Sequence, residues 1–464
     1  CEVVDGMNGI GDCTAEAPPD SFDPEVQWSW NGGSAIVTPL VINLTDDDGD
    51  GNPTTCDIPD IVVVTEDGVL HVLDGATGGE HFTIGQFVSG MVTPAVGDID
   101  GDGLPEIVAG VGGILGPLAI AAFEHDGTFK WQTEPVWDHD QGGAIAIADL
   151  DNDQSPEIIA DGVVVNADGS VRFEAPAQTG WFIAQRSTAT LAADLDGDGD
   201  LEVVLGQSAY HHDGSLYYEE LAVAPGYPQV AELDGDGNPE IIITNDNGIT
   251  ILEHDGTIKN IDVRPTGDPP GLGAWFRPAT VHDFDGDEVS EFAVSSAASY
   301  SVFEPNLLVN WTSPVQDGSG WAAGTAFDFL GDGGAEAMYA DEATLFVFDD
   351  SGSVLLSVPR SSRTLIEYPV VADVDNDGSA EIVVVSGNNW DDMQTAPTVQ
   401  VIRDAEDRWI QARRIWNQHT YHVTNVREDG TIPAFEPPSW AELNTYRTNA
   451  QIEDGEVCKP PPEG

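Results

Sequence analysis

Basic residues are scarce in this chain. Its 464 residues include only 15 Lys and Arg against 82 Asp and Glu, which gives a formal net charge of -67. Only Lys130, Lys259 and Lys459 are lysines. Because a nucleic-acid-binding protein needs a basic face to contact phosphates, this composition argues against a nucleic-acid partner. It is typical of a surface that stays soluble in saline surroundings, where salt screens charge repulsion.

Long apolar runs and cysteines are also few. The longest apolar candidate, residues 110–123, is short and is broken by glycines and Pro117, so no membrane span is predicted. No signal peptide is recognisable, and the numbering opens on Cys1. That residue is either a processed lipid-attachment site or half of a disulfide, and the disulfide is favoured. The four cysteines, which allow three pairings, are Cys1, Cys13, Cys56 and Cys458.

Acidic nine-residue repeats are abundant. The clearest copy runs from Asp98 to Glu106 and leads into the aliphatic pair Ile107-Val108. Carboxylates at positions 1, 3, 5 and 9, with a main-chain carbonyl at position 7, supply the six or more hard oxygen ligands that Ca²⁺ prefers. Mg²⁺ suits such a loop less well, because it retains its waters and requires a tighter octahedron. An EF-hand carries its glutamate at position 12 between helices, whereas here the glutamate is at position 9 and Val/Ile runs flank the loop.

The repeats predict about eight structural Ca²⁺ ions. A sharp turn around each ion requires positive φ at position 4, where Gly or Asn stands. The predicted ligands of the seven regular copies are Asp98, Asp100, Asp102, Leu104 and Glu106; Asp149, Asp151, Asp153, Ser155 and Glu157; Asp194, Asp196, Asp198, Asp200 and Glu202; Glu232, Asp234, Asp236, Asn238 and Glu240; Asp283, Asp285, Asp287, Val289 and Glu291; Asp328, Asp332, Gly334 and Glu336; and Asp373, Asp375, Asp377, Ser379 and Glu381.

Two copies depart from the pattern. The first is interrupted by an insertion, residues 52–58, and its predicted ligands are Asp46, Asp48, Asp50 and Asp60, with Asn43 as a further candidate. In the copy that starts at Asp328, Leu330 replaces the acid at position 3. We expect that site to bind calcium weakly or not at all, because the number of charged ligands tunes affinity.

The spacing of the repeats predicts a β-propeller. The regular copies start 51, 45, 38, 51, 45 and 45 residues apart, a period that accommodates one four-stranded blade. Asp-Gly pairs such as Asp126-Gly127 predict the hairpin between the third and fourth strands. Residues 26–30 alternate like an outer strand without a unit of its own, and we expect them to complete the last blade. Eight blades are favoured over seven. The predicted division of the chain is an N-terminal segment 1–25, the propeller 26–416 and a C-terminal wrapping segment 417–464.

Aromatic residues mark one predicted face. The calcium loops and the Asp-Gly hairpins should share one face of the ring, and the loops of the other face carry aromatic rings that could stack on sugars or receive a peptide side chain. For each ring alone, packing between blades is the favoured alternative. The candidate ligand-binding residues are Trp137, Trp181, Tyr227, Trp275, Trp321, Tyr368 and Trp390.

One basic cluster stands out near the C-terminus, at Arg413, Arg414, His419 and His422. General acid–base catalysis is one interpretation. A wrapping segment whose arginines pair with the acidic propeller is favoured. No nucleophile motif, phosphate-binding loop or zinc-ligand spacing is recognisable, so no catalytic residue is predicted.

The repeat typified by residues 194–202 resembles the FG-GAP/VCBS class of calcium-binding propellers, found in integrin α-subunit heads and bacterial surface proteins. The resemblance covers about residues 26–416, and the stretch from residue 415 to 433 is similar to a segment that follows such repeats in bacterial extracellular proteins. It implies a non-catalytic extracellular or cell-surface module for adhesion, assembly or glycan or protein binding, with possible self-association. The alternatives are a polysaccharide lyase similar to the propeller-type rhamnogalacturonan lyases, and a repeating subunit of a surface filament.

Overall fold

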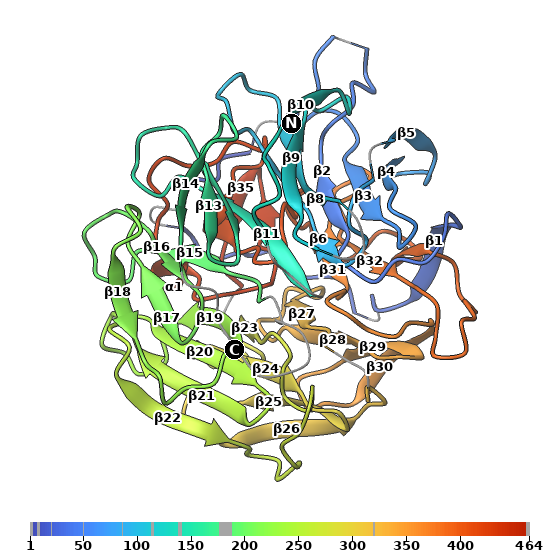
Figure 1. The fold of residues 1–464 in the computed structure, drawn as a ribbon. Coiled ribbons are helices and arrows are strands. Elements are labelled where there is room, and N and C mark those ends of the chain that lie inside the picture. The colour runs from blue at the N-terminus through green and yellow to red at the C-terminus, as the bar shows by residue number, and fades with distance from the viewer. Residues whose placement is uncertain are drawn as a thin grey trace.

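Eight small antiparallel sheets of four strands each follow one another around a ring (Figure 1). The computed structural model describes residues 3–6, 10–19, 21–49, 51–85, 87–112, 116–137, 142–175, 188–318 and 321–460. Within these ranges the predicted eight-bladed β-propeller is confirmed, and the seven-bladed alternative is wrong. The described helices are η1 (Val423–Asn425) and α1 (Ser439–Glu442). No helix among the described residues is long and apolar enough to cross a membrane.

The blades are numbered in chain order, and each is given from its innermost strand outward. Blades 1 to 4 consist of β2 (Leu40–Ile42), β3 (Asp60–Val64), β4 (Leu70–Asp74) and β5 (Glu80–Ile84); β7 (Ala95–Gly97), β8 (Glu106–Val111), β9 (Ala119–Phe123) and β10 (Phe129–Gln132); β11 (Gly143–Ala148), β12 (Glu157–Ala160), β13 (Val163–Val165) and β14 (Val171–Glu174); and β15 (Leu191–Ala193), β16 (Glu202–Val204), β17 (Ser208–Tyr210) and β18 (Leu216–Glu219).

Blades 5 to 8 consist of β19 (Tyr227–Ala231), β20 (Glu240–Asn245), β21 (Gly248–Glu253) and β22 (Ile258–Val263); β23 (Thr280–His282), β24 (Glu291–Ser295), β25 (Ser299–Phe303) and β26 (Val309–Pro314); β27 (Gly324–Phe327), β28 (Glu336–Ala340), β29 (Thr344–Phe348) and β30 (Val354–Pro359); and β31 (Val370–Ala372), β32 (Glu381–Val385), β33 (Val399–Asp404) and β1 (Pro24–Trp30). In addition, β6 (Val92–Thr93) pairs in parallel with β11, and β34 (Gln451–Glu453) pairs with β35 (Glu456–Cys458).

The strand sequences follow from this packing. Inner strands such as β8 and β24 are buried along their whole length, because neighbouring blades cover both of their faces. They therefore read as continuous aliphatic runs instead of alternating patterns. Outer strands such as β10 are a mixture of exposed and half-buried residues. The hydrophobic core thus lies between blades and not inside any single sheet.

Strands from both ends of the described chain close the ring. As predicted, β1 is the outer strand of blade 8, where it pairs with β33 from Pro24, opposite Asp404, to Trp30, opposite Val399. Trp28 of β1 also donates its indole N–H to the carbonyl of Gly75 in blade 1, at 2.7 Å. The seam between blades 8 and 1 is therefore closed by main-chain pairing and by a side chain, which removes exposed sheet edges.

Aromatic rings of six outer strands pack against a hairpin glycine of the following blade. A Cβ added to Gly169 would lie 2.8 Å from the ring of Trp131, and one added to Gly78 would lie 2.5 Å from Trp28. The φ angles of these glycines are +85° and +70°, so these turns need glycine both for conformation and for space. The other pairs are Phe82 with Gly127, Phe173 with Gly214, Tyr218 with Gly256 and Trp311 with Gly352.

The C-terminal segment, together with Trp416 directly before it, packs on the free edges of the innermost strands. The backbones of Trp416 and Val41 in β2 exchange two hydrogen bonds, of 3.0 and 2.7 Å, and those of Tyr446 and Val281 in β23 exchange two of 2.9 and 3.0 Å. These edges face the axis of a propeller, so the segment lies along the axial channel. It satisfies main-chain groups that would otherwise be unpaired.

Candidate metal centres

Each acidic repeat forms the loop between the first and second strands of a blade. In blade 6, the carboxylate of Asp283 accepts the backbone N–H groups of Gly286, at 2.7 Å, and Glu288, at 2.8 Å. The first acid of the repeat thus holds the loop folded back on itself. The predicted positive φ at position 4 is confirmed, with values from 58° at Asn152 to 79° at Gly235 in the seven regular loops. Position 6 is left-handed as well, even where it is Gln154 or Glu288.

The glutamate at position 9 anchors the other end of each regular loop. One carboxylate oxygen accepts the backbone N–H of position 2, with distances between 2.7 and 3.0 Å in the seven regular loops. In blade 6 Asp283, Asp285, Asp287 and Glu291 each place one carboxylate oxygen within 4.8 Å of the others. Four predicted ligands therefore meet at one point.

Burial makes these carboxylates costly to ionise without a cation. Burial raises the pKa of Glu291 to about 9, of Glu157 to about 7 and of Asp373 to about 7. It also raises the pKa of Glu381 well above its ordinary value, and the neighbouring acids of the same loop raise it further. A divalent cation at the centre of each loop would reverse these shifts, since it favours the charged form of every surrounding carboxylate.

The irregular loop of blade 1 uses an acid that the repeat pattern did not reveal. Asp57 is buried and places an oxygen within 4.8 Å of oxygens from Asp46 and Asp48. It lies in the inserted segment, so its position could not be found by counting from the repeat. Asp60 instead accepts the N–H of Leu44, at 2.8 Å, as the position-9 residue does elsewhere. The predicted ligand Asp50 lies outside the described residues.

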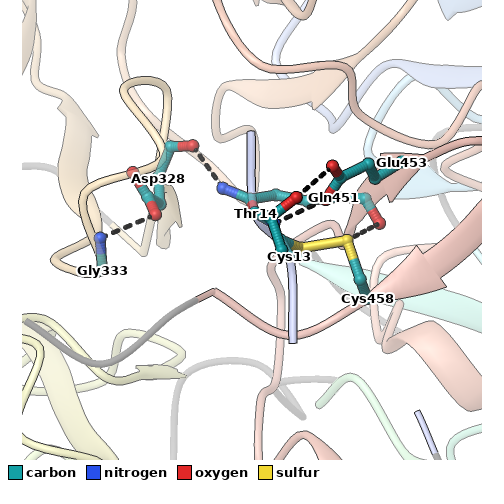
Figure 2. Close-up of a disulfide and its surroundings, with 7 residues drawn as sticks. All are labelled: Cys13, Thr14, Asp328, Gly333, Gln451, Glu453 and Cys458. Carbon is teal, nitrogen blue, oxygen red and sulfur yellow. Dashed lines mark hydrogen bonds between the residues drawn. A yellow bond between two sulfur atoms is a disulfide. The ribbon is translucent and has the colours of Figure 1, made fainter. Parts of the chain in front are cut away.

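The loop of blade 7, where Leu330 replaces an acid, is covered by both terminal segments. The N–H of Ala17 donates to the carbonyl of Leu330 at 2.7 Å. Gln451 donates to the carbonyl of Asp328 at 2.8 Å, close to the disulfide between Cys13 and Cys458 (Figure 2). Protein contacts therefore stabilise the one regular loop that has lost a ligand. Cys56 is disulfide-bonded as well, and no described cysteine is free.

A β-bulge in the outer strand of every described blade lies beside the acidic loop. The register of pairing shifts by one residue at the same point in all eight outer strands. Such an extra residue is unpaired and re-aims its side chain. The bulge residues from blade 1 to blade 8 are His81, Lys130, Arg172, Tyr217, Lys259, Asn310, Leu355 and Gln27.

Several bulge residues contact the carboxylates of their own loop. The Lys130 ammonium lies 2.6 Å from Asp100 and 2.9 Å from Glu106. Lys259 lies 2.7 Å from Asp234 and 2.6 Å from Glu240. These contacts could not be predicted from the sequence, because the strands that carry the two lysines are far from the loops in residue number.

The guanidinium of Arg172 pairs with Asp151 and Glu157 in blade 3. In blade 4 the equivalent glutamate, Glu202, is contacted at 2.9 Å by His211, which directly follows β17. The acidic loops thus differ in the group that faces their glutamate.

The predicted aromatic face is largely internal. Trp137, Tyr227, Trp275 and Tyr368 are buried among the blades or against the C-terminal segment. Their burial favours the packing interpretation for these four rings. Trp321 is partly buried, Trp390 is 66% exposed, and Trp181 lies outside the described residues. Trp390 therefore remains as the exposed aromatic of this set.

The basic C-terminal cluster is internal too. Arg413 is fully buried and pairs with Glu428 at 3.0 Å. Arg414 shares the same carboxylate at 3.1 Å and reaches Asn376 of the blade 8 loop at 2.8 Å. The favoured wrapping interpretation agrees with this geometry, although the acid that pairs both arginines belongs to the segment itself. His419 is buried, and burial lowers its pKa well below the ordinary value.

Comparison with known proteins gives one family and several similar folds. Residues 233–294 match the FG-GAP-like repeat family, and no curated protein matches. The V. cholerae biofilm matrix protein Bap1 is 21% identical with a TM-score of 0.79, over 93% of this chain and 99% of that one. The exotype rhamnogalacturonan lyase YesX is 15% identical with a TM-score of 0.55, over 97% of this chain and 82% of that one. A Bacillus licheniformis rhamnogalacturonan lyase is 16% identical with a TM-score of 0.53, over 95% and 80%.

Proposed function

Because this chain is an FG-GAP-type β-propeller, we propose that it is an extracellular, calcium-stabilised module for adhesion or surface assembly that has no catalytic role of its own. The main support for calcium binding is that converging carboxylates of the loops are buried. Glu291 and Glu381 are fully buried, and neither Glu291 Oε1 nor Glu381 Oε1 has a hydrogen-bond donor among the described residues. Oxygen-rich clusters with buried negative charge suit Ca²⁺.

The location outside the cytoplasm is supported by chemistry and by similarity. A disulfide joins Cys13 to Cys458, and disulfides persist mainly in oxidising compartments. Millimolar extracellular calcium would fill loops of moderate affinity, which cytosolic calcium would leave partly empty. The similar fold of a biofilm matrix protein, over nearly the full length of both chains, supports a role in a matrix or at a cell surface.

Thermal unfolding tests the calcium requirement. We expect the melting temperature to fall steeply when the protein is transferred from millimolar calcium to excess chelator, and to recover when calcium is restored. Magnesium at the same concentration should restore little, since it demands a tighter octahedron. A melting curve that is unchanged in excess chelator would refute this part of the proposal.

We propose that the ligand is a glycan or a protein that contacts Trp390. This ring is exposed in the loop between β32 and β33, and flat aromatic rings stack well on sugars and on peptide side chains. A glycan array with and without calcium should show binding that Trp390→Ala abolishes. Phe435→Ala is the matched control, because Phe435 is also exposed, at 72%, but lies in the C-terminal segment. Equal loss in both variants would argue against a Trp390 site.

A polysaccharide lyase is the second candidate, on the strength of similarity to two rhamnogalacturonan lyases. An acidic polysaccharide would require a cleft with available basic side chains. In this chain Lys130, Lys259 and Arg172 pair with loop carboxylates, and Arg413 is buried. Incubation with pectic substrates should therefore produce no rise in the ultraviolet absorbance of unsaturated uronides. A calcium-dependent rise would overturn the non-catalytic assignment.

A further inference from the structure

The eight acidic loops differ in the residue that the outer-strand bulge places beside them. In blades 2, 3 and 5 that residue is a permanent cation: Lys130, Arg172 or Lys259. In blades 6 and 8 it is a neutral amide, Asn310 or Gln27. The loops themselves carry acids at positions 1, 3, 5 and 9 in all five of these blades. The bulge residue is therefore the main chemical difference between the two groups.

The contacts of the position-9 glutamate follow this difference. In blades 2 and 5, Oε2 accepts the loop N–H while Oε1 is 2.9 Å from Lys130 and 2.6 Å from Lys259. In blade 3 the same oxygen of Glu157 pairs with Arg172.

In blades 6 and 8 the equivalent atoms, Glu291 Oε1 and Glu381 Oε1, are buried and have no hydrogen-bond partner among the described residues. Their amides contact the position-3 acid instead: Asn310 lies 2.9 Å from Asp285, and Gln27 lies 2.6 Å from Asp375.

We propose that Lys130, Arg172 and Lys259 are built-in cations that take the place of Ca²⁺ in the loops of blades 2, 3 and 5, whereas the loops of blades 6 and 8 take Ca²⁺ itself. The inference rests on the proposed calcium binding and divides the loops by type. An ammonium or guanidinium group bridges the position-3 and position-9 carboxylates, which are the oxygens a bound ion would share. A tethered cation also competes at every calcium concentration, because it cannot diffuse away.

The amides of blades 6 and 8 are compatible with an ion. Rotation of an Asn or Gln amide exchanges its N–H₂ for a carbonyl oxygen, which is a ligand that Ca²⁺ accepts. Gln27 Oε1 is buried without a hydrogen-bond partner among the described residues. A lysine has no acceptor to offer and adds a positive charge. Propeller loops of one sequence motif would thus be stabilised in two ways, some independent of calcium and some dependent on it.

The number of calcium ions bound by the intact chain tests the proposal. Native mass spectrometry, at a free Ca²⁺ concentration of about 10 µM set with a chelator buffer, should show one additional ion for each of Lys130→Met, Arg172→Met and Lys259→Met. Methionine keeps an unbranched stem without the charge. Lys459→Met is the matched control and should leave the count unchanged, because among the described residues Lys459 forms its ion pair with Glu442, at 3.4 Å, and not with a loop carboxylate.

The reverse substitution, which adds a cation to a loop, tests the same proposal in the opposite direction. Asn310→Lys places a cation at the bulge of blade 6, so this variant should bind one ion fewer than the wild type. Circular dichroism in calcium checks that each variant is folded. Unchanged counts in all these variants, with calcium bound to the wild type, would overturn the proposal and leave calcium stabilisation intact. A wild-type chain that binds no ion at millimolar calcium would overturn both.

Discussion

The substitution Glu291→Gln should change stability in opposite directions with and without calcium. In the metal-free protein, burial raises the pKa of Glu291 to about 9, so the carboxyl is protonated at pH 7 in the folded state and ionised in the unfolded state. The folded state must therefore take up a proton at pH 7, which lowers the free energy of unfolding by about 3 kcal/mol. This value follows from the difference of about 2.5 pH units between pH 7 and the ordinary pKa. Glutamine carries no such cost, and its amide oxygen can still accept the N–H of Phe284.

The expected gain in the metal-free protein is therefore up to about 3 kcal/mol. With an unfolding entropy of roughly 2 cal/mol/K per residue, this corresponds to a rise of about 3 °C in melting temperature for a chain of this length. At pH 5 the gain should shrink below about 1 kcal/mol, because the unfolded carboxyl then also begins to take up a proton. In millimolar calcium the sign should reverse, since the substitution removes a charged ligand.

Differential scanning calorimetry in chelator and in calcium measures both effects. Glu288→Gln is the control, because Glu288 is an exposed acid in the same loop, and exposed substitutions usually change stability by less than about 0.5 kcal/mol. If Glu291→Gln lowered the melting temperature equally in both conditions, the carboxylate would be acting through packing alone. Buried charge would then not govern the stability of this loop.

Three further predictions concern the rest of the fold. Gly169→Ala should destabilise by about 2 kcal/mol or more, because it adds a clash with the aromatic ring of the preceding blade to the cost of positive φ. The control is Gly267→Ala, where φ is +82° but nothing lies within 4 Å of the added Cβ, and it should cost only about 1 kcal/mol by urea unfolding. Equal losses of stability in the two variants would show that the ring contact contributes nothing. Removal of the Cys13–Cys458 disulfide by the double substitution Cys13→Ser and Cys458→Ser should cost up to about 5 kcal/mol in the free energy of unfolding, because its cysteines are 445 residues apart. A cost near zero in urea unfolding would contradict its role in tying the termini. Finally, burial raises the pKa of loop acids such as Asp373 to about 7. Their stabilisation is present below the unfolded pKa and lost as pH rises through 7, so the chelated protein should melt at a higher temperature at pH 5 than at pH 8, and an opposite trend in chelator would refute the shifts.

Repetition made most of the fold predictable. Seven regular copies of one loop and one irregular copy, each followed by an aliphatic strand, predicted the blade count, the loop positions and the left-handed residues at position 4 without any long-range information. The place of β1 in blade 8 could also be predicted, because an unpaired strand before the first repeat has only the last blade left to complete. The clustering of acids in regular loops follows from spacing, since residues within nine positions of each other are held by local geometry.

Other features depend on contacts between residues far apart in the chain. Asp57 lies beside Asp46 and Asp48 only because the inserted segment folds back toward the loop. The length of an insertion follows no repeat, so the position of this acid cannot be counted from the motif. The burial of Trp137 and Tyr227 depends on neighbouring blades and on a C-terminal segment that no repeat describes.

The sequence by itself determined a ring of acidic loops, because the carboxylates of each regular loop are contained in nine consecutive residues. Tertiary structure alone decided which group faces each loop, because the β-bulge that carries Lys130 or Asn310 belongs to a strand that reaches the loop only after the sheet has formed. The pairing of loop carboxylates with Lys130, Arg172 and Lys259 is therefore a property of strand pairing, and strand pairing is set by contacts that residue order along the chain does not display.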